Sequence, residues 1–198
     1  MTTVAPRATR QASVGPVLLG VGLLAGVTAA AIAALALTDA LLATGLPNPG
    51  PVTNYGLPFV RAAGEIAAVV AVGSFLLAAF LVPPQTSGVL DVAGYRALRI
   101  GTFASAVWAV SAALLVPLTA SDVTGQPVSS LTPTDVWSIA GLVETAGAWR
   151  WTAALAGIVT IAGLPVLRWA WTPVLFGGSL ITLLPLALSG HSSSGGSH

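Results

Sequence analysis

The sequence is poor in charged residues and rich in apolar ones. Of its 198 residues only 7% are charged and 55% are hydrophobic, whereas a soluble domain has about 25% charged residues. A chain of this composition could not cover its surface with polar groups in water, and in a lipid bilayer it has no need to. The composition therefore predicts a multi-pass integral protein of the plasma membrane. Its net charge is +1 and it carries no basic patch, so no nucleic-acid partner is expected.

Cysteine and lysine are absent, and methionine occurs only as Met1. Without cysteine the chain has no disulfide, no thiolate metal site and no cysteine nucleophile. Without an internal methionine it has no internal thioether ligand for copper(I). The sequence also lacks the GxSxG, HExxH and Walker A motifs, and no GxGxxG follows a strand. We therefore expect no enzyme activity from this chain.

Long apolar runs dominate what remains. With their flanks, they are long enough to cross the roughly 30 Å hydrocarbon core of a bilayer at about 1.5 Å per helical residue. The predicted spans lie near residues 14–43, 59–82, 100–118, 150–167 and 171–188. The predicted fold class is all-α: a polytopic membrane helix bundle of about five transmembrane helices over residues 14–188. Residues 1–13 form a polar segment before it, and residues 189–198 form a Gly/Ser/His tail after it.

The first apolar run allows a second interpretation. A basic segment before an apolar run is also typical of a secretory signal peptide. The run over 14–43 is longer than the usual apolar region of about 7–15 residues, and no good cleavage site follows it. We therefore favour a membrane span. Gly22 and Gly26 form a GxxxG pattern, which would allow close approach of another helix.

The connections differ in character. Prolines and glycines over 44–58 predict a loop. Thr132, Pro133 and Asp135 predict a helix start, with Thr as the N-cap, Pro at the first helical position and an acid three residues after the cap. A single helix from Pro133 to Leu164 would measure about 48 Å, too long for one crossing. We therefore expect a short interfacial helix near 134–147, on the extracytoplasmic side, before the fourth span.

The arginines predict the sidedness. Five crossings place the two termini on opposite sides of the membrane. With a cytoplasmic N-terminus, the two outside arginines are Arg61 and Arg150. The inside arginines are then Arg7, Arg10, Arg96, Arg99 and Arg168. Because cytoplasmic loops carry the excess of positive residues, this orientation is favoured, and the C-terminal tail is predicted to be extracytoplasmic.

Two ionisable residues fall within the second span. Arg61 and Glu65 are four residues apart, on one face of a helix, and are expected within about two turns of the outer boundary. One interpretation is that they form an intramembrane charge pair that neutralises itself and extends outward. The other is an ion or proton site, since charges within a span are costly and often functional.

The two histidines, His191 and His198, are the only good nitrogen ligands for a metal. Imidazole suits copper, zinc, nickel or iron. Two histidines are too few for a closed site, and the Gly/Ser spacing between them proves no geometry. A surface tail or linker without a ligand is the alternative.

Several stretches resemble a known family. The tail contains Gly190-His191 and then Gly195-Gly196-Ser197-His198. It resembles the Gly-His…Gly-Gly-x-His junction of actinobacterial CopD-type copper resistance membrane proteins, which are often fused to a CtaG-type cytochrome c oxidase assembly domain. Further similar stretches are Gly56–Pro58 with Arg61–Glu65, Phe80–Pro84, Gly94–Arg99 and Leu115–Asp122. The resemblance implies copper as the ligand, with a role in copper transport, copper resistance or copper supply to oxidase assembly.

The sequence also departs from that family pattern. There the junction leads into a further helix bearing a His and a Trp-Gly-Gly, whereas this sequence ends at His198. We expect either a shortened copy or a standalone relative. Besides the bilayer, the expected partners are further helices of the family domain or another membrane protein, including the respiratory oxidase assembly machinery. The competing hypothesis is a structural or accessory subunit that binds no ligand and packs within a larger complex.

Overall fold

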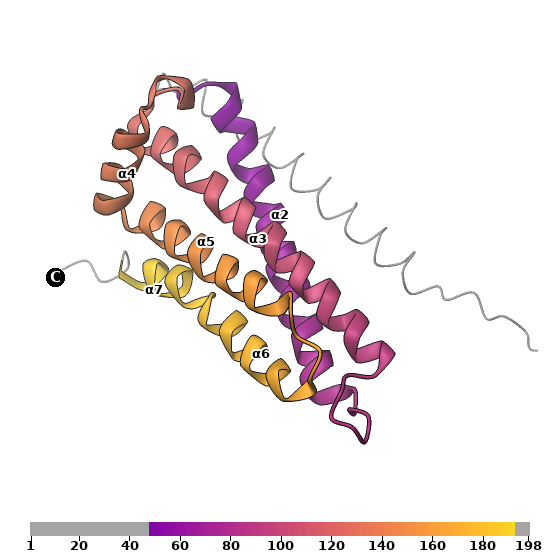
Figure 1. Cartoon of the computed structure of the whole chain (residues 1–198). Helices are drawn as coiled ribbons and strands as arrows, with labels where there is room; N and C mark the ends of the chain where they lie inside the picture. The colour runs from indigo at the N-terminus through magenta and orange to yellow at the C-terminus, as the bar shows by residue number, and fades with distance from the viewer. Residues whose placement is uncertain (1–47, 193–198) are drawn as a thin grey trace, which may run out of the picture.

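The computed structural model describes residues 48–192 as a bundle of helices, and this part of the chain contains no named strand (Figure 1). The elements are α2 (Pro51–Leu76), the π-helical η1 (Leu77–Leu81), α3 (Val92–Thr124), the 3-10 turn η2 (Val128–Ser130), α4 (Pro133–Leu142), α5 (Glu144–Gly163), the 3-10 turn η3 (Trp169–Trp171), α6 (Thr172–Ile181) and α7 (Leu184–Ser192). The predicted all-α fold class is therefore confirmed. The predicted segment 1–13 and the span 14–43 lie outside the described residues.

Three helical stretches in the described part are long and apolar enough to cross a membrane. They cover Pro51–Leu81, Val92–Thr124 and Trp169–Ser189. Helix α5 is about 30 Å long, but its first half carries Glu144 and Arg150, which lower its mean hydropathy. It corresponds to the predicted fourth span, 150–167, and begins six residues earlier (150 − 144 = 6).

The predicted loop over 44–58 is wrong in its second half, because α2 begins at Pro51. Proline is well suited to the first turn of a helix, where its missing N–H needs no acceptor. Gly50, with φ of 89°, makes the sharp entry into the helix. Pro58 lies inside the helix without ending it. The second span therefore starts about two turns before the predicted Phe59.

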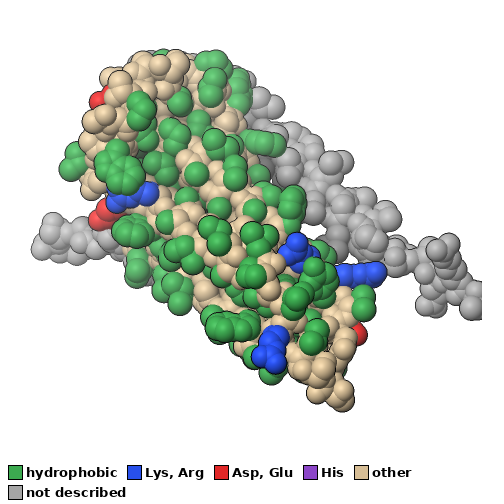
Figure 2. Space-filling model, viewed as in Figure 1, with side chains coloured by type: hydrophobic (Ala, Val, Ile, Leu, Met, Phe, Trp, Pro, Cys, Tyr) green, Lys and Arg blue, Asp and Glu red, His purple; other side chains and the backbone are tan. Residues whose placement is uncertain are grey.

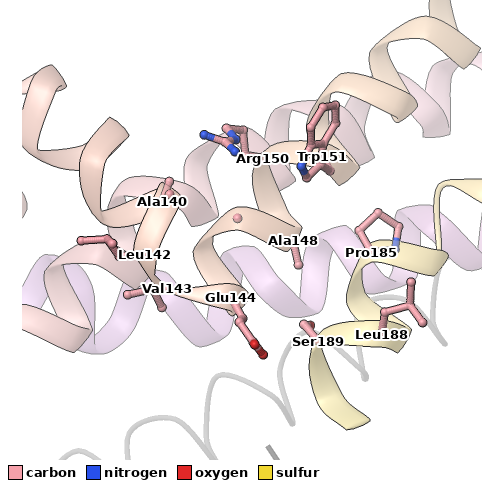
Figure 3. Close-up of a pocket in the computed structure, with 12 residues that line it drawn as sticks. Ala140, Leu142, Val143, Glu144, Ala148, Arg150, Trp151, Pro185, Leu188 and Ser189 are labelled. Carbon is pink, nitrogen blue, oxygen red and sulfur yellow. The ribbon is translucent and has the colours of Figure 1, made fainter. Parts of the chain in front are cut away.

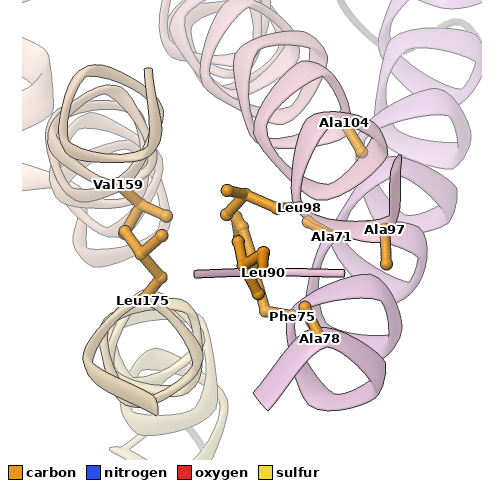
Figure 4. Close-up of a cluster of buried hydrophobic side chains, with 9 residues drawn as sticks. All are labelled: Ala71, Phe75, Ala78, Leu90, Ala97, Leu98, Ala104, Val159 and Leu175. Carbon is orange, nitrogen blue, oxygen red and sulfur yellow. The ribbon is translucent and has the colours of Figure 1, made fainter. Parts of the chain in front are cut away.

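Helix α3 packs between α2 and α5, and small residues permit the close approach. A Cβ atom on Gly101 would lie 2.9 Å from the ring of Phe75 in α2, and one on Gly163 in α5 would lie 2.6 Å from the Thr102 hydroxyl. Any side chain at these glycines would force the helices apart. Figure 4 shows part of the resulting core, where Phe75 and Leu98 lie beside Val159.

One end of the bundle is joined by hydrogen bonds between segments distant in sequence. The π-helical turn η1 leaves backbone carbonyls without their usual helical partners, and the indole nitrogen of Trp169 donates to the Ala79 carbonyl at 3.0 Å. The Trp169 backbone nitrogen donates to the Gly88 carbonyl at 3.1 Å. Arg99 donates to the Leu164 carbonyl at 3.1 Å. The loop before α3 and the loop after α5 are thus tied together, close to α2.

The opposite end carries α4, which begins with the predicted cap. The Asp135 backbone nitrogen donates to the Thr132 hydroxyl oxygen, and the Thr132 backbone nitrogen donates to the Asp135 carboxylate at 2.9 Å. The Thr132 hydroxyl also donates to the Asp135 carboxylate at 2.6 Å, and this hydrogen bond, followed by that from the Thr132 backbone nitrogen, holds the pKa of Asp135 below its usual range. The helix ends at Leu142, so the predicted helix near 134–147 is too long. The chain turns at Val143, which has an extended backbone, and Gly147 then lies so close to the Ala140 carbonyl that a Cβ would lie 2.9 Å from it.

The last span is broken, whereas we predicted one continuous helix over 171–188. Helix α6 ends at Ile181 and α7 begins at Leu184. Pro185 lacks an N–H, so it cannot continue the α-helical hydrogen bonds of α6 at the Ile181 carbonyl. The Thr182 hydroxyl donates to the Gly178 carbonyl at 2.8 Å near the end of α6. The span therefore consists of two short helices with a break at its middle.

Candidate functional site

The charge pair on α2 is formed as its spacing predicts. Arg61 Nε donates to Glu65 Oε1 at 3.0 Å, and both side chains are more than half exposed on the described bundle. Because α2 begins at Pro51, Glu65 is the fifteenth residue (65 − 51 + 1) of the 31-residue span Pro51–Leu81. The pair therefore lies near the middle of that helical stretch, and its position within about two turns of the outer boundary stays a prediction.

A cavity of about 480 Å³ lies beside this pair, between α2, α3, α5 and the break in the last span. Among the described residues that line it, Glu65 is the only charged one, and the others are apolar, with Trp108, Trp149, Leu183 and Leu186 among them. Trp108 and Trp149 are nearly fully buried. This cavity joins a carboxylate to an apolar space, but it contains no histidine.

A second cavity, of about 460 Å³, lies where the α4–α5 corner meets α7 (Figure 3). Glu144, the first residue of α5, lines it together with Leu188 and Ser189 of α7. Figure 3 shows Glu144 and Ser189 on the same side of α5, with Arg150 on another side. The α4–α5 corner and the end of the last span are thus brought together.

Of the two predicted metal ligands, His191 falls within the residues that the structure describes. His191 belongs to α7, two residues after Ser189, so its backbone continues the helix that lines the second cavity. His198 lies outside the described residues. Within the part of the chain that the structure describes, no three His, Cys, Asp or Glu side chains gather as a metal-binding group. His191 and Glu144 alone would make an incomplete copper site.

Sequence reasoning missed the surroundings of Arg150. Its guanidinium carbon lies 4.7 Å from the ring centre of Trp137 in α4 and 5.9 Å from that of Trp151. Trp151 is its neighbour in sequence, and this could have been noticed. Trp137 belongs to α4 and lies beside Arg150 because the chain turns at Val143 between α4 and α5, which local spacing does not show.

Two hydroxyls inside the bundle have no hydrogen-bond partner. They belong to Ser105 of α3 and Thr152 of α5, and both residues are fully buried. A buried hydroxyl without a partner costs stability, on the order of 1–3 kcal/mol. These side chains were not singled out from the sequence, because nothing local distinguishes them from the other Ser and Thr residues of the helices.

The comparisons with known proteins point to copper resistance. The family described as "Copper resistance protein D-like, N-terminal domain" matches residues 52–198. An uncharacterized protein of Mycobacterium leprae is 25% identical over 91% of this chain and 28% of its own length. Uncharacterized proteins of Mycobacterium bovis and Mycobacterium tuberculosis are each 26% identical over 96% of this chain and 29% of their own length. The chain thus spans less than a third of these relatives, and no solved structure matches it.

The family match covers most of the chain, including α2 to α7 and both histidines. It agrees with the resemblance seen in the tail and with the apolar spans of the described bundle. The chain belongs to the copper resistance protein D-like N-terminal domain family, and at that level it is a copper-related membrane protein.

Proposed function

We propose that this protein handles copper at the membrane as a non-catalytic component of copper transport, copper resistance or copper supply to oxidase assembly. Copper is the cargo, and the corner between Glu144 and the end of α7 is where the protein meets it. The observation that carries the proposal is that α7, the helix to which His191 belongs, borders the Glu144 cavity through Leu188 and Ser189, in a chain of a copper resistance family.

The donors at this corner suit a transient copper site. A neutral imidazole binds copper in either common oxidation state, and a carboxylate adds an oxygen ligand and negative charge. Two donors leave the coordination incomplete, so copper would be released readily or passed to further ligands. Those ligands would come from His198, from further helices of the family domain or from a partner such as the oxidase assembly machinery.

Copper titration of the solubilised chain tests this proposal. We expect weak binding by the wild type, a clear loss in His191→Ala and a smaller loss in Glu144→Gln and His198→Ala. Binding should weaken as pH falls through about 6.5, because protonated imidazole cannot coordinate a metal. Asp91→Asn, at the opposite end of the bundle, is the control and should bind as the wild type does.

The titration is repeated in any longer natural form, where added ligands should tighten binding. Identical copper binding by the wild type and all three site variants there would remove these residues from the mechanism. An accessory subunit that packs against further helices would then be favoured, and the half-exposed charge pair in the middle of α2 is the observation that supports it.

The proposed orientation places the N-terminus in the cytoplasm and α4 with the C-terminus outside. Its support is the three arginines at the joined end of the bundle, with Arg96 and Arg99 near the start of α3 and Arg168 before η3. Figure 2 shows Lys or Arg side chains gathered toward this end. The chain has no cysteine, so single cysteines can report sidedness. On intact cells a membrane-impermeant thiol reagent should label Ser129→Cys in η2 and spare Ser87→Cys in the loop before α3. The reverse pattern would invert the proposed orientation, and labelling after cell lysis is the control for reactivity.

A further inference from the structure

A third cavity forms a groove of about 440 Å³ between α3, η2, α4 and α5. Its lining residues are apolar apart from Arg150, and they include Ala113 and Val116 of α3, Trp137 of α4 and Ala153 of α5. A groove with one cation and otherwise apolar walls matches a molecule that has one anionic group and a hydrocarbon body. Arg150 borders both this groove and the cavity proposed for copper, but Glu144 and Ser189 line only the latter.

The guanidinium of Arg150 is held at the groove by aromatic rings. Trp137 and Trp151 lie on it at 4.7 and 5.9 Å from ring centre to guanidinium carbon. Cation–π contacts of this kind fix the position of the cation. The ring faces offer no oxygen acceptor to the N–H groups of the guanidinium. These N–H groups can therefore donate to an anionic oxygen that enters the groove. A planar guanidinium recognises carboxylate and phosphate groups by paired hydrogen bonds, and every phospholipid headgroup carries a phosphate.

The surroundings of the groove are those of a membrane–water boundary. Trp137 and Trp151 are 67% and 59% exposed, and Leu142 at the end of α4 is 85% exposed. Figure 2 shows a cation and an acid among hydrophobic side chains on this part of the visible face. Exposed Trp residues next to Arg are typical of the headgroup level of a bilayer. From there the walls of α3 and α5 continue along the membrane-spanning part of the bundle.

We propose that this groove binds a phospholipid with an anionic headgroup. The phosphate pairs with Arg150, and one acyl chain lies along the apolar wall formed by α3, α4 and α5. The occupant is a lipid because the bilayer supplies such molecules at this depth and the groove carries a single complementary charge. Net negative lipids are preferred, since one arginine near the headgroups favours them by roughly fivefold.

Native mass spectrometry of the delipidated, detergent-solubilised full chain tests the site with two probes, phosphatidylglycerol and phosphatidylcholine. The wild type should bind phosphatidylglycerol roughly fivefold more tightly than phosphatidylcholine. Arg150→Gln should lose this preference, and Arg96→Gln, an exposed arginine at the opposite end, should keep it. Equal binding of both lipids by the wild type, or an unchanged preference in Arg150→Gln, would overturn the proposal.

A second pair of variants tests the groove without touching the charge. Ala113 lines the groove at an exposed position, so Ala113→Phe fills it without disturbing the core. This variant should bind phosphatidylglycerol several-fold more weakly, whereas Ala154→Phe, exposed on α5 outside the groove, should bind it as the wild type does. Equal binding by the two variants contradicts an acyl-chain site. Displacement of the lipid by millimolar inorganic phosphate would instead indicate a site for free anions and would also overturn the proposal.

Discussion

Replacing Trp108 with alanine is expected to lower the free energy of unfolding by about 3 kcal/mol. Trp108 is only 1% exposed and packs against Ala67, Ala68 and Ala156. Its neighbours are alanines, which cannot move in to fill the space that the indole leaves. The expected value is the lower end of the range for buried aromatic residues, because packing rather than water exclusion holds helices together in a bilayer.

The measurement is unfolding of the detergent-solubilised protein by increasing sodium dodecyl sulfate, followed by circular dichroism. Trp171→Ala is the matched control, because Trp171 is 58% exposed in η3. It should change the free energy of unfolding by less than about 0.5 kcal/mol. Equal losses in the two variants would show that Trp108 does not occupy the centre of the bundle. Since Trp108 also lines the cavity beside Glu65, the alanine variant should enlarge that cavity.

Glu65→Gln is expected to destabilise the protein more than the double variant Arg61→Gln with Glu65→Gln. The single variant leaves Arg61 without its partner at 3.0 Å, near the middle of a membrane-spanning helix. An arginine at that depth costs about 2.5–3.5 kcal/mol on insertion scales. The double variant removes both charges, so only the hydrogen bond and the packing of the two stems are lost.

The same unfolding experiment measures both variants and the single Arg61→Gln variant. The four proteins form a double-mutant cycle, and the coupling between the two residues is expected to be about 2 kcal/mol. If the double variant loses as much as the two single variants together, the residues act independently. If copper-dependent growth is lost while the free energy of unfolding is unchanged, the pair has a functional role instead of a structural one.

The sequence was informative where local rules decide the structure. The cap at Thr132 and the i,i+4 spacing of Arg61 and Glu65 depend on residues within one helical turn, and the structure has both. The start of α2 was missed because proline and glycine were counted as loop formers. Proline in the first turn of a helix follows a different rule, since that position needs no N–H donor.

Other features depend on contacts between distant segments. The Glu65 cavity takes its walls from α2, α3, α5 and the last span, and no pattern within one helix predicts such a meeting. The break near Thr182 is not predicted by hydropathy, because the apolar run continues through it. Pro185 is the one local signal for this break. The approach of Glu144 to α7 follows from the end of α4 at Leu142 and from the packing of α5 beside α7, which is a contact between distant segments. For His191 and His198, the copper role stays a prediction.

The hydrogen bonds at the joined end have a mechanical consequence. Trp169 ties η1 to the start of the last span, and Arg99 ties α3 to the end of α5. Because these hydrogen bonds hold the helices together at one end, a rotation of α6 and α7 relative to α2 is expected to pivot at η3. The helices would then separate most at the other end. The displacement would then be greatest at Ser189, where the last span borders Glu144. A small tilt at the pivot would thus change the width of the corner that we propose for copper, while the joined end stayed closed.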